Sequence, residues 1–169
     1  MTQSRMNVAE EIHGVQALEG KYLTFALGDE EYGLGILKVR EIIGIMEITP
    51  VPHTPDYVKG VINLRGRVIP VLDLRLKFGM ESKGYVDRTC VIVVEVQGQA
   101  GTIQIGMVVD SVSEVLNISA GEIEPPPSFG ANIETTYLLG MAKIKGKVKI
   151  LLDIDKIIGQ GEMLELKAI

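Results

Sequence analysis

Histidine and cysteine are the residue types in this chain that most often bind metal ions or act in catalysis, and neither occurs in a pattern that suits those roles. His13 lies near the N-terminus, and His53 lies between a proline and a threonine in a proline-rich loop. A general base requires a positioned partner, and a zinc site requires several ligands at defined spacings. Cys90 is the only cysteine and lies in the apolar run TCVIVVEV, where we expect a buried, reduced thiol. The sequence therefore predicts neither a catalytic histidine nor a metal site.

Two aspartates, Asp73 and Asp153, could be mistaken for a pair of catalytic carboxylates. Each begins a short segment, DLRLKFG or DIDKIIG, that ends in a glycine. Aspartate is favoured as the N-cap of a helix, and glycine is favoured just after its C-terminus. We therefore expect both aspartates to cap short helices. The chain also contains no glycine-rich phosphate-binding motif and no G-x-S-x-G motif. The sequence thus predicts no enzymatic activity and no cofactor.

The composition argues against nucleic-acid binding and against membrane insertion. The net charge is −5, the isoelectric point is about 5.1, and aromatic residues make up 5% of the chain. A barrel that binds single-stranded nucleic acid needs basic grooves with stacking aromatic side chains. The N-terminal residues are mostly polar, and no apolar run reaches the roughly 20 residues that span a bilayer. We expect a soluble cytoplasmic protein.

The elements that must position any functional side chain follow an internal repeat. The later part of the first copy recurs 80 positions further on, so that Gly66 matches Gly146. The earlier part recurs 73 positions further on, so that Glu41 matches Glu114. The loops between the two parts, EITPVPHTPDY and EIEPPPSFGANIETTY, differ in length. Each copy therefore predicts about five short strands followed by one short helix.

Short strands with turn signals every 8–12 residues or so predict small β-barrels rather than a parallel sheet. A single five-stranded barrel has few interior positions, so two barrels that share an apolar interface would bury more surface per residue. We expect a flexible tail over residues 1–18, a first barrel over about 19–85, a second barrel over about 86–160, and a terminal helix or tail over 161–169.

Arg65 lies directly before the turn glycine in the segment INLRG, and the second copy has Lys145 at the matching position. We hypothesise that Arg65 pairs with Glu41. The acid and the base both recur in the second copy, which favours a structural salt bridge. Only the first copy has a guanidinium, whose planar fork suits two-point recognition, and arginine is enriched in the energetic centres of interfaces. The difference between the copies favours a role of Arg65 in partner binding.

The segments YLTFALGDEEYGLGILKVREI, TPDYVKGVINLRGRVIPVLDLRLKFG and VVDSVSEVL closely resemble the CheW family of bacterial chemotaxis coupling proteins. The resemblance extends over residues 19–160, and VKGVINLRG followed by VIPVLDLR is its most specific part. It implies an all-β fold with short helices, in which two five-stranded SH3-like β-barrels pack around a shared apolar core. It also implies a non-enzymatic adaptor that binds chemoreceptor tips and the regulatory domain of the histidine kinase CheA, in cytoplasmic arrays at the inner membrane.

By the same resemblance, two groups of residues are expected to contact partners. The receptor-binding group contains Val39, Glu41, Lys59, Gly60 and Arg65. The kinase-binding group contains Ile45, Ile48, Gly66 and Val68 in the first half and Glu124, Ser128 and Phe129 in the second.

Several of these residues also have structural explanations. Gly60 and Gly66 recur in the second copy, so that backbone geometry accounts for them, and Val39 recurs as a valine that fits a core. Phe129 follows three prolines and either folds back onto the barrel or anchors a partner. Leu139 replaces Lys59 in the second copy, so the fold does not require this lysine.

One alternative function remains within the same family. CheW-like domains also occur fused to kinase or response-regulator domains, so the chain could be a regulatory domain related to a larger signalling protein. The sequence ends soon after Gly159 and no phosphoacceptor domain follows, which favours a stand-alone coupling protein.

Overall fold

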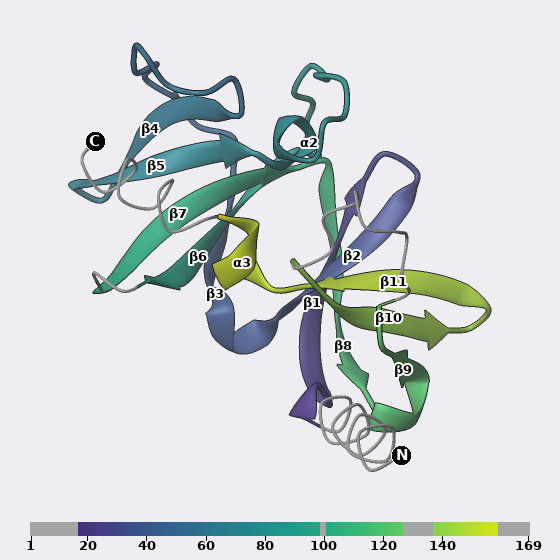
Figure 1. The fold of residues 1–169 in the computed structure, drawn as a ribbon. Coiled ribbons are helices and arrows are strands. Elements are labelled where there is room, and N and C mark those ends of the chain that lie inside the picture. The colour runs from purple at the N-terminus through teal and green to yellow at the C-terminus, as the bar shows by residue number, and fades with distance from the viewer. Residues whose placement is uncertain (1–16, 99–100, 127–136, 159–169) are drawn as a thin grey trace.

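The computed structural model describes residues 17–98, 101–126 and 137–158. These residues form two mixed β-sheets with short helices between them (Figure 1). The six-stranded sheet has the order β8 (Ser111–Ile118), β1 (Gly20–Leu27), β2 (Glu30–Gly35), β11 (Lys147–Leu152), β10 (Leu138–Ile144) and β9 (Ile123–Glu124). The five-stranded sheet has the order β3 (Val39–Gly44), β6 (Cys90–Gly98), β7 (Gly101–Val109), β5 (Arg67–Asp73) and β4 (Val58–Leu64). The helices are η1 (Ile36–Lys38), α2 (Leu74–Lys77), η2 (Ala120–Glu122) and α3 (Ile154–Ile157).

The predicted all-β architecture of two small barrels is confirmed, and the two-residue strand β9 makes one sheet six-stranded. The two sheets do not follow the two halves of the sequence. The β1–β2 hairpin of the first copy lies beside β8, β10 and β11 of the second, whereas the β6–β7 hairpin of the second copy lies beside β3, β4 and β5 of the first. The parallel pairs β2–β11 and β5–β7 make this exchange. The boundary expected near residue 85 therefore does not separate the two sheets.

Three apolar clusters hold the fold together. The largest lies between the sheets and takes buried side chains from both, including Phe25, Ile92, Met107, Leu152 and Ile157. Two smaller clusters fill the interiors of the individual sheets. Burying one such side chain contributes about 1.5–3 kcal/mol, so the shared cluster is the main force that joins the sheets.

Strand β6 shows how the sequence builds two of these clusters at once. Val91 and Val93 lie in the interior of the five-stranded sheet, while Ile92 and Val94 lie in the cluster between the sheets. Neighbouring residues of a strand point to opposite faces, so a strand that is buried on both faces must be apolar throughout. Cys90 begins this strand and is half-buried rather than fully buried, because the chain emerges from an exposed loop there.

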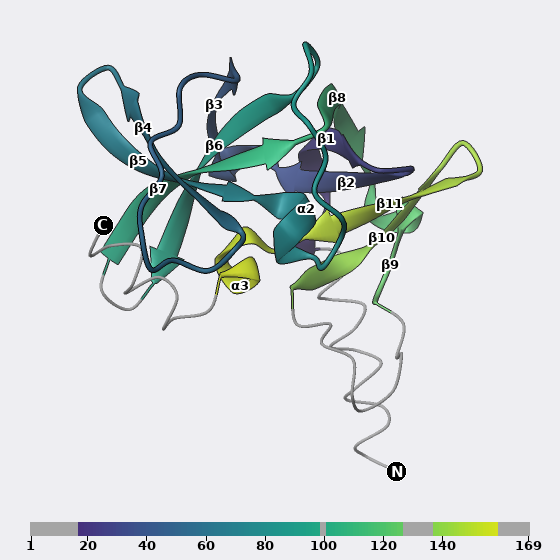
Figure 2. The same cartoon turned by 90° about the horizontal axis from the view of Figure 1, so that it is seen from above.

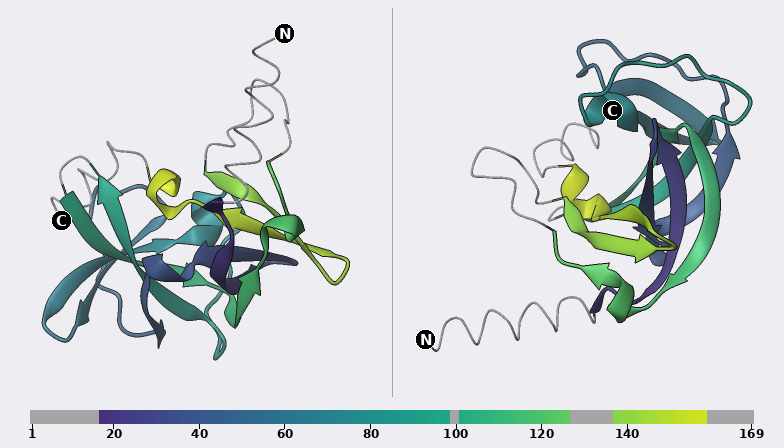
Figure 3. Two further views of the ribbon diagram at one scale, coloured as in Figure 1. Left: turned by 90° about the horizontal axis from the view of Figure 1, so that it is seen from below. Right: turned by 90° about the vertical axis from the view of Figure 1, so that its right-hand side faces the viewer.

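The short helices α2 and α3 lie between the two sheets (Figures 2 and 3). The N-cap prediction is confirmed, because the Asp73 carboxylate accepts hydrogen bonds from the backbone of Arg75 at 3.0 Å and Leu76 at 3.4 Å, and Asp153 accepts one from Asp155 at 3.1 Å. Phe78 ends α2, where its ring lies between Tyr32 of β2 and Tyr137, at centroid distances of 5.8 and 5.4 Å.

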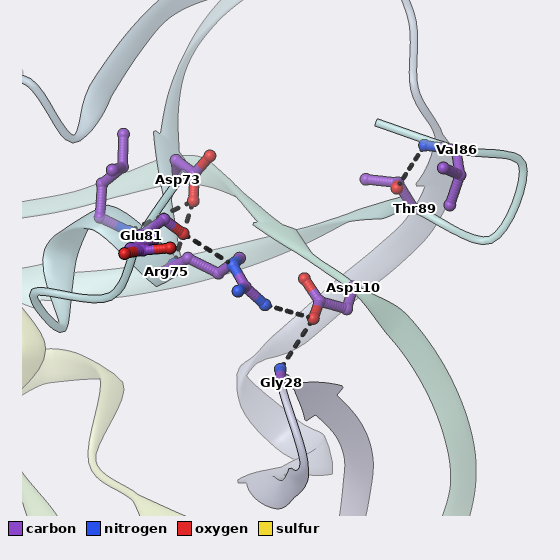
Figure 4. A network of polar contacts seen from close by, with 8 residues as sticks. Gly28, Asp73, Arg75, Glu81, Val86, Thr89 and Asp110 are labelled. Carbon is purple, nitrogen blue, oxygen red and sulfur yellow. Dashed lines mark hydrogen bonds and ion pairs between the residues drawn. The ribbon is translucent and has the colours of Figure 1, made fainter. Parts of the chain in front are cut away.

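A polar clamp also joins the sheets at the start of α2 (Figure 4). Arg75 donates through Nη1 to Oδ2 of Asp110 at 2.6 Å, and both side chains are at most 17% exposed. The same carboxylate oxygen accepts the backbone N–H of Gly28 at 2.8 Å, while Nε of Arg75 donates to the carbonyl of Glu81 at 3.0 Å. Gly28 lies in the β1–β2 turn of the other sheet, so this clamp ties α2 to both sheets.

The corresponding contact at α3 has the opposite arrangement of charge. Asp155 occupies the repeat position of Arg75, and its carboxylate binds Nζ of Lys38 at 2.7 Å and the backbone N–H of Gln97 at 2.9 Å. The helix supplies the base in one copy and the acid in the other. The repeat has therefore kept the position of an inter-sheet clamp while reversing its charges.

Candidate partner-binding surface

The Arg65–Glu41 pair predicted from the repeat is present in the structure. The guanidinium Nη2 of Arg65 donates to Oε1 of Glu41. The pair therefore joins the β4–β5 turn to β3, the strand at the opposite edge of the five-stranded sheet. The arginine side chain is 71% exposed and that of Glu41 is 29% exposed. The hydrogen bond and the charge of Glu41 raise the pKa of Arg65 above its ordinary value, so the arginine stays charged. The pair occupies an N–H group at one edge of the guanidinium and leaves most of the arginine side chain open to solvent.

The turn that carries Arg65 is a two-residue hairpin with an unusual first residue. Arg65 has φ 53° and Gly66 has φ 86°, which are the left-handed values of a type I′ turn. Asn63 supports the turn by accepting the backbone N–H of Gly66 at 2.8 Å. Asparagine and glycine suit the first position of such a turn, whereas a long side chain there is strained. Arginine is therefore not the residue that the turn itself favours.

We expect Arg65→Asn to leave the midpoint of thermal unfolding unchanged or to raise it, because asparagine accepts the left-handed conformation more readily. The hypothesis that Arg65 contacts a partner predicts binding about tenfold weaker or worse, because the guanidinium is lost. Calorimetric unfolding together with partner pull-down measures both effects. Lys145→Asn is the matched control, because Lys145 has φ 53° in the equivalent turn and should change stability in the same direction without changing binding. A clear fall in the unfolding temperature of Arg65→Asn would make the arginine structural.

The second copy does not reproduce the pair. In the part of the chain that the structure describes, neither Lys145 nor Glu114 forms an ion pair. The backbone of Glu114 instead exchanges hydrogen bonds with the hydroxyl of Thr24. Lys143, two residues before Lys145, binds Glu124 at 2.6 Å. The acid and base recur in sequence, but only the first copy brings them together.

The other expected receptor-binding residues lie on the same sheet but differ in exposure. Val39 is half-buried and packs against the core between the sheets, whereas Lys59 is half-buried at the start of β4. Gly60 is buried, and a Cβ atom placed there would lie 2.0 Å from the carbonyl oxygen of Thr49. The structure thus gives Gly60 and Val39 packing roles, while the side chains of Glu41, Lys59 and Arg65 are partly or largely exposed.

The expected kinase-binding residues of the first half include exposed apolar side chains. Val68 on β5 is 65% exposed and Ile45 after β3 is 37% exposed, while Ile48 is half-buried against the interior of the five-stranded sheet. Contiguous exposed apolar side chains mark protein interfaces, whereas single ones are common on any protein surface. Glu124 is exposed on β9, where it binds Lys143. Ser128 and Phe129 lie outside the described residues.

His53 and Tyr85 are two residues whose side chains could take part in metal binding or acid–base chemistry. His53 is exposed in the loop before β4, and no group of three metal-binding side chains occurs in residues 17–98, 101–126 and 137–158. Tyr85 donates its hydroxyl to Asp73 at 3.3 Å. Burial, followed by the Asp73 carboxylate, raises the pKa of Tyr85 to about 12, so this hydroxyl remains a donor at neutral pH. Within the same ranges, no helix is long and apolar enough to cross a membrane.

Sequence reasoning missed the segment Ser82–Tyr85, which lies beside Lys59 and Ile48. This segment follows Gly79, the last residue of the first copy that the repeat comparison aligned, so the comparison did not include it. Its Lys83 was the available signal, because it is a basic residue in a loop next to a candidate site.

These features define a class of protein: a small double-barrel β module that carries an exposed arginine–glutamate pair and exposed apolar side chains. Residues 21–162 match the CheW-like domain, and the chain belongs to this family.

Relatives with known names and one solved structure agree with this assignment. The chain is 43% identical over 143 residues to the chemotaxis protein CheW of Klebsiella aerogenes, with 85% of this chain and 84% of the relative covered. It is 36% identical over 135 residues to the chemotaxis protein CheW of Rhizobium meliloti, with 80% and 84% covered. The crystal structure of the scaffolding protein TtCheW from Thermoanaerobacter tengcongensis has a TM-score of 0.74 at 36% identity, covering 86% of this chain and 96% of that one.

Proposed function

We propose that this protein is a non-enzymatic scaffold of bacterial chemotaxis, which couples the cytoplasmic tips of chemoreceptors to the histidine kinase CheA. Family membership and the names of the relatives support the pathway. The observation that carries the coupling role is the exposed Arg65–Glu41 pair, held in a turn that does not itself favour arginine. The proposed place of action is the cytoplasm, at receptor arrays on the inner membrane.

The proposal assigns different partners to neighbouring parts of the five-stranded sheet. Glu41, Lys59 and Arg65 offer charged groups to the receptor tip, with Val39 and Gly60 shaping the surface below them. Ile45, Ile48, Gly66 and Val68 form the apolar contact with the kinase. Burial of such side chains supplies affinity, while the charged groups supply orientation and rate of association.

A pull-down with purified CheA-type kinase and receptor tip, separately and together, tests the proposed function. Arg65→Ala and Glu41→Ala should each weaken assembly about tenfold while circular dichroism stays that of the wild type. Lys145→Ala is the matched control and should bind normally. If wild-type protein captures neither partner, the coupling role is wrong.

The double variant Arg65→Glu/Glu41→Arg separates pairing from direct contact. When mutual pairing alone matters, the reversed pair restores binding. When Arg65 itself touches the partner, the double variant folds as the wild type does but does not regain binding. Neither ATP nor a divalent metal ion should raise the unfolding temperature, and a rise of several degrees would contradict a non-enzymatic function.

A further inference from the structure

A cavity of ≈ 330 Å³ opens on the same sheet, next to the proposed receptor surface. Three segments form it: the loop after β3, the start of β4, and the loop between α2 and β6. Its lining residues are Ile48, Lys59, Ser82, Lys83, Gly84 and Tyr85.

The lining of this cavity is positively charged. Lys59 is half-buried and Lys83 is exposed, and among the described residues neither lysine forms an ion pair. No carboxylate belongs to the lining. Two lysines in the lining, with no carboxylate among the lining residues, give the cavity a positive potential that favours an anion.

The remaining walls suit the carbon chain of an acidic residue. Ile48 packs against the interior of the five-stranded sheet and is half-buried. The Tyr85 hydroxyl already donates to Asp73, so this residue does not offer a free hydroxyl donor to the cavity. The cavity thus combines an apolar wall with two cations and a serine hydroxyl, which fits a carboxylate carried on a short aliphatic stem.

We propose that this cavity receives an acidic side chain of the chemoreceptor tip, and that Lys83 is a further receptor-contacting residue. The inference rests on the proposed function and extends its surface from β4 to the loop between α2 and β6. The positive charge of the lining favours an acidic side chain. Lys59 belongs both to this cavity and to the proposed receptor surface, which favours the receptor over the kinase as the partner. Because Leu139 takes the place of Lys59 in the second copy, the fold does not account for this lysine.

Lys83→Glu tests the electrostatic part of this proposal. Binding of a purified receptor-tip fragment, measured by isothermal titration calorimetry, should weaken about tenfold, and the wild-type affinity should depend more steeply on salt than that of the variant. Lys156→Glu is the matched control, because this lysine is exposed on α3 in the other half of the chain, and it should bind as the wild type does. A Glu→Lys or Asp→Lys change at one position of the receptor tip should restore binding to Lys83→Glu.

Ser82→Tyr tests the cavity itself without a change of charge. The larger side chain should fill the cavity and weaken receptor binding, whereas Ser82→Ala should weaken it far less, because it removes one hydroxyl and keeps the cavity open. If the wild type binds the receptor tip and Lys83→Glu binds equally well, the cavity proposal is overturned while the coupling function stands. A loss confined to kinase binding would overturn it as well. If the wild type fails to bind the receptor tip, the proposed function fails first.

Discussion

Gly60→Ala is expected to lose about 4 kcal/mol or more of unfolding free energy, because both backbone strain and a steric clash oppose any side chain there. Gly60 has φ 141°, and an added Cβ would lie 2.0 Å from the carbonyl oxygen of Thr49 and 2.9 Å from Cα of Pro50. That carbonyl cannot move aside, because it accepts the N–H of Val61 at 2.9 Å while the N–H of Thr49 donates back at 2.8 Å. The three atoms nearest to the added Cβ are all backbone atoms, of Thr49 and Pro50.

Chemical denaturation followed by circular dichroism measures this loss. Gly44→Ala is the control, since a Cβ at this exposed position of β3 meets nothing within 4 Å, and its effect should stay within about 0.5 kcal/mol. If Gly60→Ala is as stable as the wild type, the loop between β3 and β4 can move away from the added methyl group, and the expected clash is wrong. The expected result has a consequence for function, because any loss of partner binding in a Gly60 variant then reports misfolding rather than a lost contact.

Glu31→Ala should destabilise the protein by about 3 kcal/mol, because it leaves a buried ammonium group without its counter-charge. Lys149 of β11 is only 8% exposed, and its Nζ binds Oε2 of Glu31 on the parallel neighbour β2. Ser113 completes the site by donating to Oε1 of Glu31 at 2.9 Å. The cost is at the lower end for buried pairs, since Glu31 is 35% exposed. Urea denaturation gives the change in free energy directly.

The repeat supplies a repair for this variant. The positions of Lys149 and Glu31 correspond to Ile69 and Gln104 in the five-stranded sheet, where Ile69 is 2% exposed. Lys149→Ile/Glu31→Gln should therefore recover most of the wild-type stability, because the buried charge is removed together with its partner. Glu30→Ala is the control for loss of a neighbouring exposed carboxylate and should change little. An equally unstable double variant would mean that the ion pair itself is required.

Features that depend on neighbouring residues could be predicted from the sequence. Asp73 and Asp153 cap helices because a carboxylate reaches the N–H groups two or three residues ahead of it. Gly79 ends α2 with φ 74°, as a glycine after a helix should, while Gly159 lies outside the described residues. Apart from the two-residue β9, the strands followed from apolar runs and turn residues in the same way.

Features that depend on distant residues were predicted only where the repeat revealed them. The repeat suggested the Arg65–Glu41 pair, which the structure contains. Lys145 and Glu114 occupy the equivalent positions in the second copy, but they do not contact each other as an ion pair. The apolar pattern of a strand does not show which strand will lie parallel to it. The exchange of the β1–β2 and β6–β7 hairpins between the two copies could therefore not be predicted. The sequence gives no sign that Lys149 is buried, because the alternation of side chains along a strand does not show which face a lysine occupies.

The exchange of hairpins between the repeats makes this chain comparable to a domain-swapped dimer whose two protomers have been fused. Each copy lends two strands to the other and cannot complete a sheet from its own. In a true swapped dimer this arrangement depends on protein concentration, but here the tether keeps the exchanging strands at a fixed effective concentration. Opening one sheet necessarily pulls a hairpin away from strands that the other half provides. We therefore expect the two barrels to unfold in a single cooperative transition. A partner that binds one barrel should also stabilise the other.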